Sequence, residues 1–120
     1  MTDKELLELA AKAAGMNVLA EPWPEESGWF FCLHHGDPAL HFRNLEDRDV
    51  RPNPWKPLND DGDALRLAVS APTIIDLQWI IAEAWQAHDG FDARIAYVRR
   101  AIVEKIALPF ARTTDTGGEA

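Results

Sequence analysis

The sequence of 120 residues is short of several features, and each shortage excludes a class of protein. It has a single cysteine, Cys32, so no disulfide can form within the chain and a reducing compartment is favoured. No apolar run approaches the roughly 20 residues that a membrane-spanning helix needs. Lysine and arginine number 12 against 20 acidic residues, and the net charge of -8 opposes binding to nucleic acid or anionic membranes.

The motifs of cofactor-dependent enzymes are also missing. The sequence contains no glycine-rich phosphate loop and no dinucleotide-binding fingerprint. The stretch Met1–Glu5 shows no signal-peptide pattern. We therefore expect a cytoplasmic protein that uses no cofactor and has no membrane partner.

The composition is that of a folded domain with an aromatic-rich core. Hydrophobic residues make up 47% of the chain, including five Trp and five Phe. A chain of this length is expected to form one domain, which we place at residues 1–112. Residues 113–120 contain paired glycines and no apolar residue before the final alanine, so we predict a disordered C-terminal tail.

Capping signals predict three helices. Thr2 and Glu5 form a capping box, which predicts a helix over Asp3–Ala14. Asn59 or Asp60 can cap a second helix over residues 60–70. The third helix begins at Asp92 and is expected to end at Pro109.

Two aromatic runs on either side of a Gly/Asp/Pro turn predict a β-hairpin. With residues 35–38 as the loop, Leu33 faces Leu40 and Phe31 faces Phe42, and Trp29 joins them on the core side. The opposite side then carries a mixed set of residues: Phe30, Cys32, His34, His41 and Arg43.

The segment 73–85 is rich in branched and aromatic residues, which favours two short strands separated by a turn at residues 76–78. A helix over Asp76–Ala87 is the rival interpretation, because five apolar residues also fit a helical stripe: Leu77, Ile80, Ile81, Ala84 and Trp85. With the strands adopted, the fold class is α+β. We predict a four-stranded, mainly antiparallel sheet with three helices packed on it, in the order α-β-β-α-β-β-α.

One stretch of the sequence is similar to a known family. The corner Trp55-Lys56-Pro57-Leu58-Asn59-Asp60-Asp61 leads into the helix that ends near Val69, and a closing helix covers residues 93–103. Together they resemble the small proteins of tailed phages and prophages that carry the phage ABA sandwich domain. The resemblance implies a four-stranded sheet with three helices, a phage or prophage origin and no assigned biochemical role. It transfers no catalytic or ligand residue to this chain.

One candidate site lies on the outer side of the hairpin. Cys32, His34 and His41 could meet there, and a thiolate with two imidazoles is a plausible set of zinc ligands. No fourth ligand is evident, because His35 is expected on the other side. The same residues could form a nucleophile and its base, but no oxyanion-hole motif accompanies them. We therefore interpret Cys32 as a small packing residue and predict no metal and no catalysis.

The remaining candidates are partner-binding residues. The last helix carries four basic residues that could face nucleic acid or an acidic partner: Arg94, Arg99, Arg100 and Lys105. Trp29 and Trp85 are expected in the core, whereas Trp23 and Trp55 lie in proline-bounded loops and could anchor the corner or fill a partner's pocket.

These features predict a small acidic binding protein that is not an enzyme. The partner would be a host or phage protein, in a host-takeover or anti-defence role. An accessory nucleic-acid-binding protein is the first alternative, and a Cys/His metal-binding protein is the second. The sequence leaves the oligomeric state open.

Overall fold

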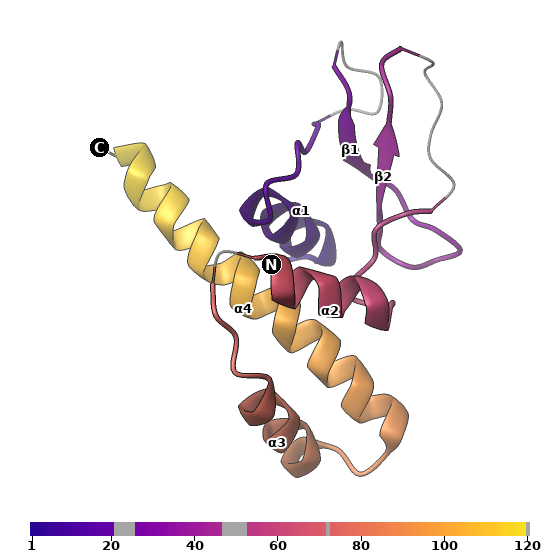
Figure 1. The fold of residues 1–120 in the computed structure, drawn as a ribbon, viewed down its shortest axis with the longest axis vertical. Helices are drawn as coiled ribbons and strands as arrows, with labels where there is room; N and C mark the ends of the chain where they lie inside the picture. The colour runs from indigo at the N-terminus through magenta and orange to yellow at the C-terminus, as the bar shows by residue number, and fades with distance from the viewer. Residues whose placement is uncertain (21–25, 47–52, 72, 120) are drawn as a thin grey trace.

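The structure is a computed structural model that describes residues 1–20, 26–46, 53–71 and 73–119, the last seven by their backbone alone. Its helices and strands follow the order α-β-β-α-α-α (Figure 1). The helices and strands are α1 (Asp3–Ala13), β1 (Gly28–Phe31), β2 (Leu40–Arg43), α2 (Asp61–Ser70), α3 (Leu77–Ala87) and α4 (Phe91–Glu119).

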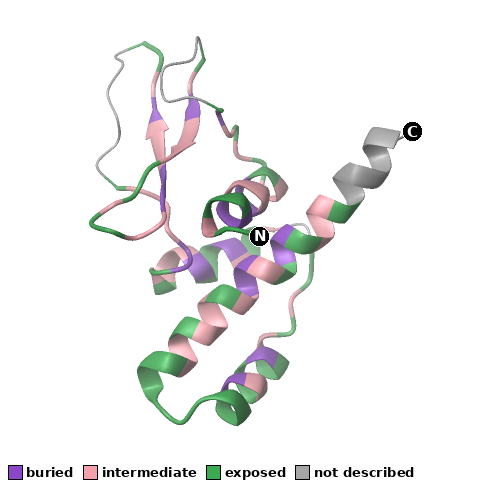
Figure 2. Cartoon of the chain, turned by 180° about the vertical axis from the view of Figure 1, so that it is seen from behind, coloured by how far each residue is buried: buried purple, intermediate pink, exposed green. Residues whose placement is uncertain are grey.

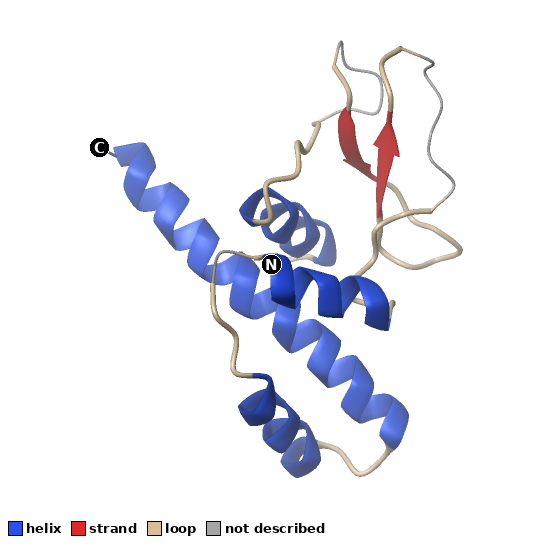
Figure 3. Cartoon of the chain, viewed as in Figure 1, coloured by secondary structure: helices blue, strands red, loops and turns tan. Residues whose placement is uncertain are grey.

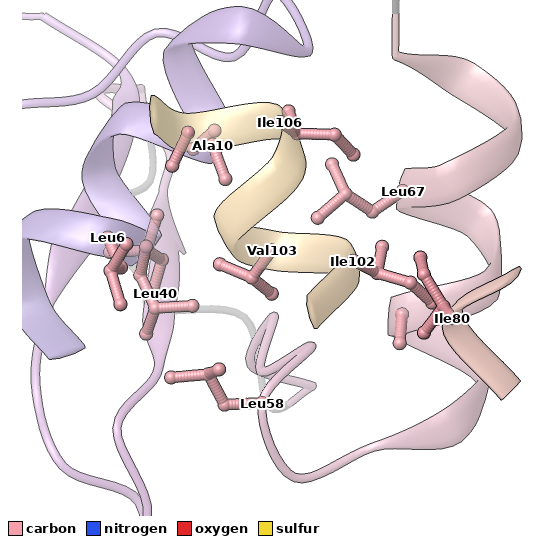
Figure 4. Close-up of a cluster of buried hydrophobic side chains, with 13 residues drawn as sticks. Leu6, Ala10, Leu40, Leu58, Leu67, Ile80, Ile102, Val103 and Ile106 are labelled. Carbon is pink, nitrogen blue, oxygen red and sulfur yellow. The ribbon is translucent and has the colours of Figure 1, made fainter. Parts of the chain in front are cut away.

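The long helix α4 is the centre of the fold. Helices α1, α2 and α3 each pack against it, while the hairpin of β1 and β2 lies at the opposite end of the molecule from α3 (Figure 1). Val103 of α4 is fully buried among side chains from α1, α2, β2 and the corner before α2 (Figure 4). The core comprises Leu6, Leu7, Ala10, Ala11, Leu40, Leu58, Ala64, Leu67, Ile80, Ile102, Val103, Ile106 and Ala107.

The first two helices begin as the capping signals predicted. The backbone N–H of Glu5 donates to the Thr2 hydroxyl at 3.1 Å, and that of Asp63 donates to the Asp60 carboxylate at 2.8 Å. Asp60, rather than Asn59, is therefore the cap of α2. The predicted bounds of α1 and α2 agree with the structure to within one residue, because these caps depend only on nearby residues.

The hairpin forms with a different register from the one predicted. Trp29 pairs with Phe42 and Phe31 pairs with Leu40, so the predicted pairs of Phe31 with Phe42 and Leu33 with Leu40 are wrong. The error is two residues, and side chains alternate with a period of two. Trp29 and Phe31 therefore keep their predicted face and pack against the core. The prediction was wrong for Leu33, which is exposed, and for Arg43, which was expected on the outer side and is buried.

The shorter turn explains the register. It consists of His35 and Gly36 alone, with the pair His34 and Asp37 closing it through two backbone hydrogen bonds. Both turn residues have positive φ, 52° for His35 and 87° for Gly36, as a two-residue hairpin turn requires. Histidine is one of the few residues besides glycine that tolerate this conformation, and the sequence prediction overlooked it.

The predicted four-stranded sheet is not formed, although the protein is of mixed α and β structure. Within the described residues the sheet has two strands (Figure 3). Single-residue bridges extend it at both edges, from Val18 to Trp29 and from Trp55 to Leu40. These bridges satisfy backbone groups at both edges of the hairpin but do not continue into strands.

The segment predicted as two strands forms helix α3, which was the rival interpretation. The carboxylate of Asp76 accepts the backbone N–H of Trp79 at 3.0 Å and so caps the helix. Ile80 and Ala84 are buried, at the spacing of one helical turn. The prediction failed because branched and aromatic residues favour strands both before the helix, at Ile74 and Ile75, and within it, whereas burial against α4 favours a helix.

Helix α4 continues past its predicted end. Pro109 lies inside the helix, which extends to Glu119 and begins one residue before Asp92. A proline removes one backbone hydrogen bond, but the buried residues Ile106 and Ala107 hold the turn before it against the core. The predicted disorder of residues 113–120 stays a prediction.

Candidate functional site

The main candidate site is a groove between the segment leading into α3, α3 itself and the middle of α4. It encloses about 710 Å³. Ile74, Trp79 and Glu83 are on one wall, and Tyr97, Lys105 and Leu108 of α4 are on the other. We call this feature the α3–α4 groove. Its α4 wall extends from residue 97 to residue 112, which at 1.5 Å per residue is about 22 Å.

The apolar side chains of the groove are open to solvent. Ile74 is 99% exposed and Trp79 is 62% exposed, although both are large hydrophobic residues. Figure 2 shows that α3 has much exposed surface and little buried surface. Exposed apolar residues gathered at a concave surface are typical of binding sites.

Packing against α4 decides which side chains α3 exposes. Ile80 and Ala84 lie one helical turn apart on the side that packs against α4, and they are the buried residues of the helix. Trp79 and Trp85 then lie away from the core, and each is 62% exposed. The expectation that Trp85 belongs to the core was therefore wrong, whereas Trp29 does pack against the core.

Three of the four basic candidates on α4 connect this helix to other helices. Arg94 lies 3.5 Å from the ring centroid of Trp85 and donates to the carbonyl of His88, at the end of α3. Arg99 pairs with Asp61 of α2 at 2.8 Å. Arg94 and Arg99 are therefore engaged by other residues of the chain.

Arg100 also contacts another helix, whereas Lys105 forms no ion pair in the described part of the chain. Arg100 pairs with Asp3 of α1 at 3.0 Å and with Glu104 at 3.8 Å. Lys105 is exposed, lines the α3–α4 groove and has no ion pair within the described part of the chain. Three of the four basic residues that the sequence suggested for partner binding are therefore held by contacts within the chain.

The hairpin candidates lie on one side of the sheet but do not form a metal site. Cys32 is an exposed free thiol, and Nε2 of His41 lies 3.0 Å from the Cys32 carbonyl oxygen. The ring centroids of His34 and His41 are 5.9 Å apart. No group of three or more His, Cys, Asp or Glu residues could hold a metal ion in the regions that the structure describes.

His34 is the centre of a small histidine cluster. The ring of His35, which was expected on the other side, lies 4.3 Å from that of His34. Partial burial lowers the pKa of His34 below its ordinary value, and neighbouring positive charges lower this pKa further, opposed by Asp37. The charged or titratable groups that face it are His35, Lys56, His41 and Asp37.

Of the two loop tryptophans proposed for partner binding, the structure describes only Trp55. Trp23 lies outside the described residues. Trp55 is half-buried against the core, and its backbone N–H and C=O both pair with Leu40. In this position Trp55 anchors the corner before α2.

The groove residues Ile74 and Trp79 were missed by the sequence analysis. Assigning residues 73–85 to strands concealed them, since the exposed face of a helix cannot be seen in a strand pattern. The signal that could have found them is Asp76, a capping residue three positions before Trp79.

The chain matches no protein-family model, no curated protein and no solved structure. The resemblance to the phage ABA sandwich domain stays a prediction, and the four-stranded sheet that it implied is corrected by the structure. Among the described residues, no helix has both the length and the apolar character needed to cross a membrane.

Proposed function

We propose that this protein is a small, non-enzymatic binding protein whose α3–α4 groove accepts an amphipathic helix of a partner protein. The observation that carries the proposal is the exposure of Ile74 and Trp79 in a groove of about 710 Å³. Helices bind such grooves by inserting apolar side chains spaced three or four residues apart. The α4 wall, about 22 Å long, matches about four helical turns.

The charges of the groove define the chemistry of the partner helix. Asp76 and Glu83 give the α3 side of the groove negative charge, while Lys105 is a positive charge on the α4 side. A complementary helix would carry an apolar stripe with basic residues on one flank and acidic residues on the other. Such pairs at the rim contribute mainly to orientation and specificity.

The proposed biological role follows from the resemblance of the corner and the closing helix. We place the protein in a tailed phage or prophage, where it would bind a host protein in host takeover or interference with defence. The net charge of -8 supports a protein partner over nucleic acid. The internal ion pairs of Arg99 and Arg100 also support this choice, since they leave fewer cations for phosphate contacts.

The test is a pull-down from lysate of the bacterial host with the tagged full chain and three variants. Ile74→Glu and Leu108→Glu each place a charge in the groove at an exposed apolar position. Leu65→Glu is the matched control, because Leu65 is 56% exposed on α2 and does not line this groove. A protein retained by the wild type and by Leu65→Glu, and lost by both groove variants, supports the proposal.

Two outcomes would contradict it. If the wild type retains no host protein, the proposed function is wrong. If the groove variants retain the same protein as the wild type, the groove is not the binding site. A gel shift with DNA or RNA checks the alternative: we expect none, whereas phosphate binding would produce a complex that weakens steeply with added salt.

A further inference from the structure

The tip of the hairpin gathers three of the four histidines of the chain, namely His34, His35 and His41, which we call the histidine cluster. The ring centroid of His34 lies 4.3 Å from that of His35 and 5.9 Å from that of His41. Histidine is the side chain whose ordinary pKa lies just below neutral pH. A modest change of pH therefore alters the charge of this cluster.

The cluster surrounds the point where the turn of the hairpin closes. The backbone N–H of His34 donates to the Asp37 carbonyl at 2.8 Å, and the N–H of Asp37 donates to the His34 carbonyl at 2.9 Å. Nε2 of His41 lies 3.0 Å from the Cys32 carbonyl oxygen, so the third ring connects the two sides of the hairpin next to the turn. The three rings are therefore placed to act on the bonds that close the turn.

An ion pair connects this turn to the corner before α2. Nζ of Lys56 lies 3.4 Å from a carboxylate oxygen of Asp37, and both side chains are partly buried. The backbone N–H of Lys56 donates to the carboxylate of Asp63, in the first turn of α2, at 2.9 Å. The pair of Asp37 and Lys56 thus joins the hairpin tip to the start of a helix.

The charges around His34 are unbalanced. The described groups that face it are His35, Lys56, His41 and Asp37. Asp37 is the one acid among these four described groups, and it already pairs with Lys56. Partial burial and then the neighbouring positive charges lower the pKa of His34, so the closed tip resists the positive charge that acid adds.

We infer that the histidine cluster is a proton-sensitive switch that opens the tip of the hairpin below about pH 6. While the rings are uncharged, they pack against one another and Asp37 holds Lys56. When acid charges the rings, they repel one another and Lys56, and they compete with Lys56 for Asp37. The backbone pair of His34 with Asp37 and the ion pair of Asp37 with Lys56 are then lost together.

The switch acts on the tip and leaves the core side of the hairpin in place. Leu40 is fully buried, and its backbone pairs with Trp55 in both directions at 2.8 Å without a histidine. The hairpin also lies at the opposite end of the molecule from α3 (Figure 1). The inference is therefore independent of the partner helix proposed for the α3–α4 groove.

The test is amide hydrogen exchange of the purified full chain, measured by NMR at pH 7.5 and pH 5.5 and corrected for the intrinsic exchange rate at each pH. The reporters are the amides of His34 and Asp37, which close the turn. Like charges 4 to 6 Å apart in water each shift an equilibrium several-fold, so we expect the protection of both reporters to fall about 10-fold at pH 5.5. Both should remain less protected than the amide of Val103 in the core, because the tip opens without unfolding of the protein.

Three variants separate the switch from a general effect of acid. His34→Gln removes the central charge and should reduce the 10-fold response to about 2-fold. His88→Gln is the matched control, since the fourth histidine lies at the end of α3 against Tyr97, and it should keep the full response. Asp37→Asn removes the acid that holds Lys56, so its tip should already be open at pH 7.5.

Four results would overturn the inference. The reporters could keep the same protection at both pH values, or they could exchange only as slowly as Val103 at pH 5.5. The acid response could persist in His34→Gln or disappear in His88→Gln. None of these results bears on the proposed function, which the groove variants test separately.

Discussion

Ile80 is the large side chain that attaches α3 to the core, and replacing it measures how firmly this helix is held. It is fully buried, and the other buried residue of the helix is the much smaller Ala84. Ile80→Ala removes about three methylene-sized groups at ~0.8 kcal/mol each and leaves a cavity, so we expect a loss of about 3 kcal/mol. For 120 residues, at about 2.1 cal/mol/K per residue, this lowers the melting midpoint by about 12 °C.

The neighbouring residue supplies the control. Ile81 is the same residue type in the same helix but is 47% exposed, so Ile81→Ala should lose only about 1 kcal/mol. Both variants are measured by urea and thermal denaturation at the same protein concentration. Equal losses in the two variants, or a loss below about 1 kcal/mol in Ile80→Ala, would refute the assignment of Ile80 as the contact that holds α3.

Two further predictions concern the helix cap and the histidine cluster. Asp60→Ala should destabilise the protein by about 1 kcal/mol in urea denaturation, because it removes the acceptor for the Asp63 N–H, whereas Asp60→Asn keeps an acceptor and should change little. Because folding lowers the pKa of His34, protonation of this residue favours the unfolded chain. The contribution of His34 to the free energy of unfolding is therefore complete above about pH 6.5, and it is lost as the pH decreases through the folded-state pKa. His34→Gln should flatten this fall in denaturation midpoints measured from pH 8 to pH 5, and an unchanged pH profile would contradict the assignment.

The features that sequence reasoning predicted correctly depend on short stretches of chain. The caps of α1 and α2 are examples, since Thr2 and Asp60 bind backbone groups three residues away. The core-facing side of Trp29 and Phe31 is a third, because side-chain alternation survives a register error of two residues. None of these needs information about distant contacts.

The candidate site could be predicted only in part. Lys105 was named as a binding residue and does line the groove, but Arg99 and Arg100 are held by acids on α2 and α1. Arg99 binds Asp61, which is 38 residues away, and Arg100 binds Asp3, which is 97 residues away. Sequence spacing within α4 contains no information about these pairs.

The sequence alone determined where the chain starts its helices, where it turns and how its side chains alternate, because hydrogen bonds and capping between near neighbours decide these features. Tertiary structure decided that residues 77–87 form a helix, since burial of Ile80 and Ala84 against α4 outweighs the strand preference of the branched residues before them. It also decided which tryptophans are exposed. A side chain is buried or open according to the elements that cover it, and here α4 covers one side of α3 while the side centred on Ala82 faces solvent.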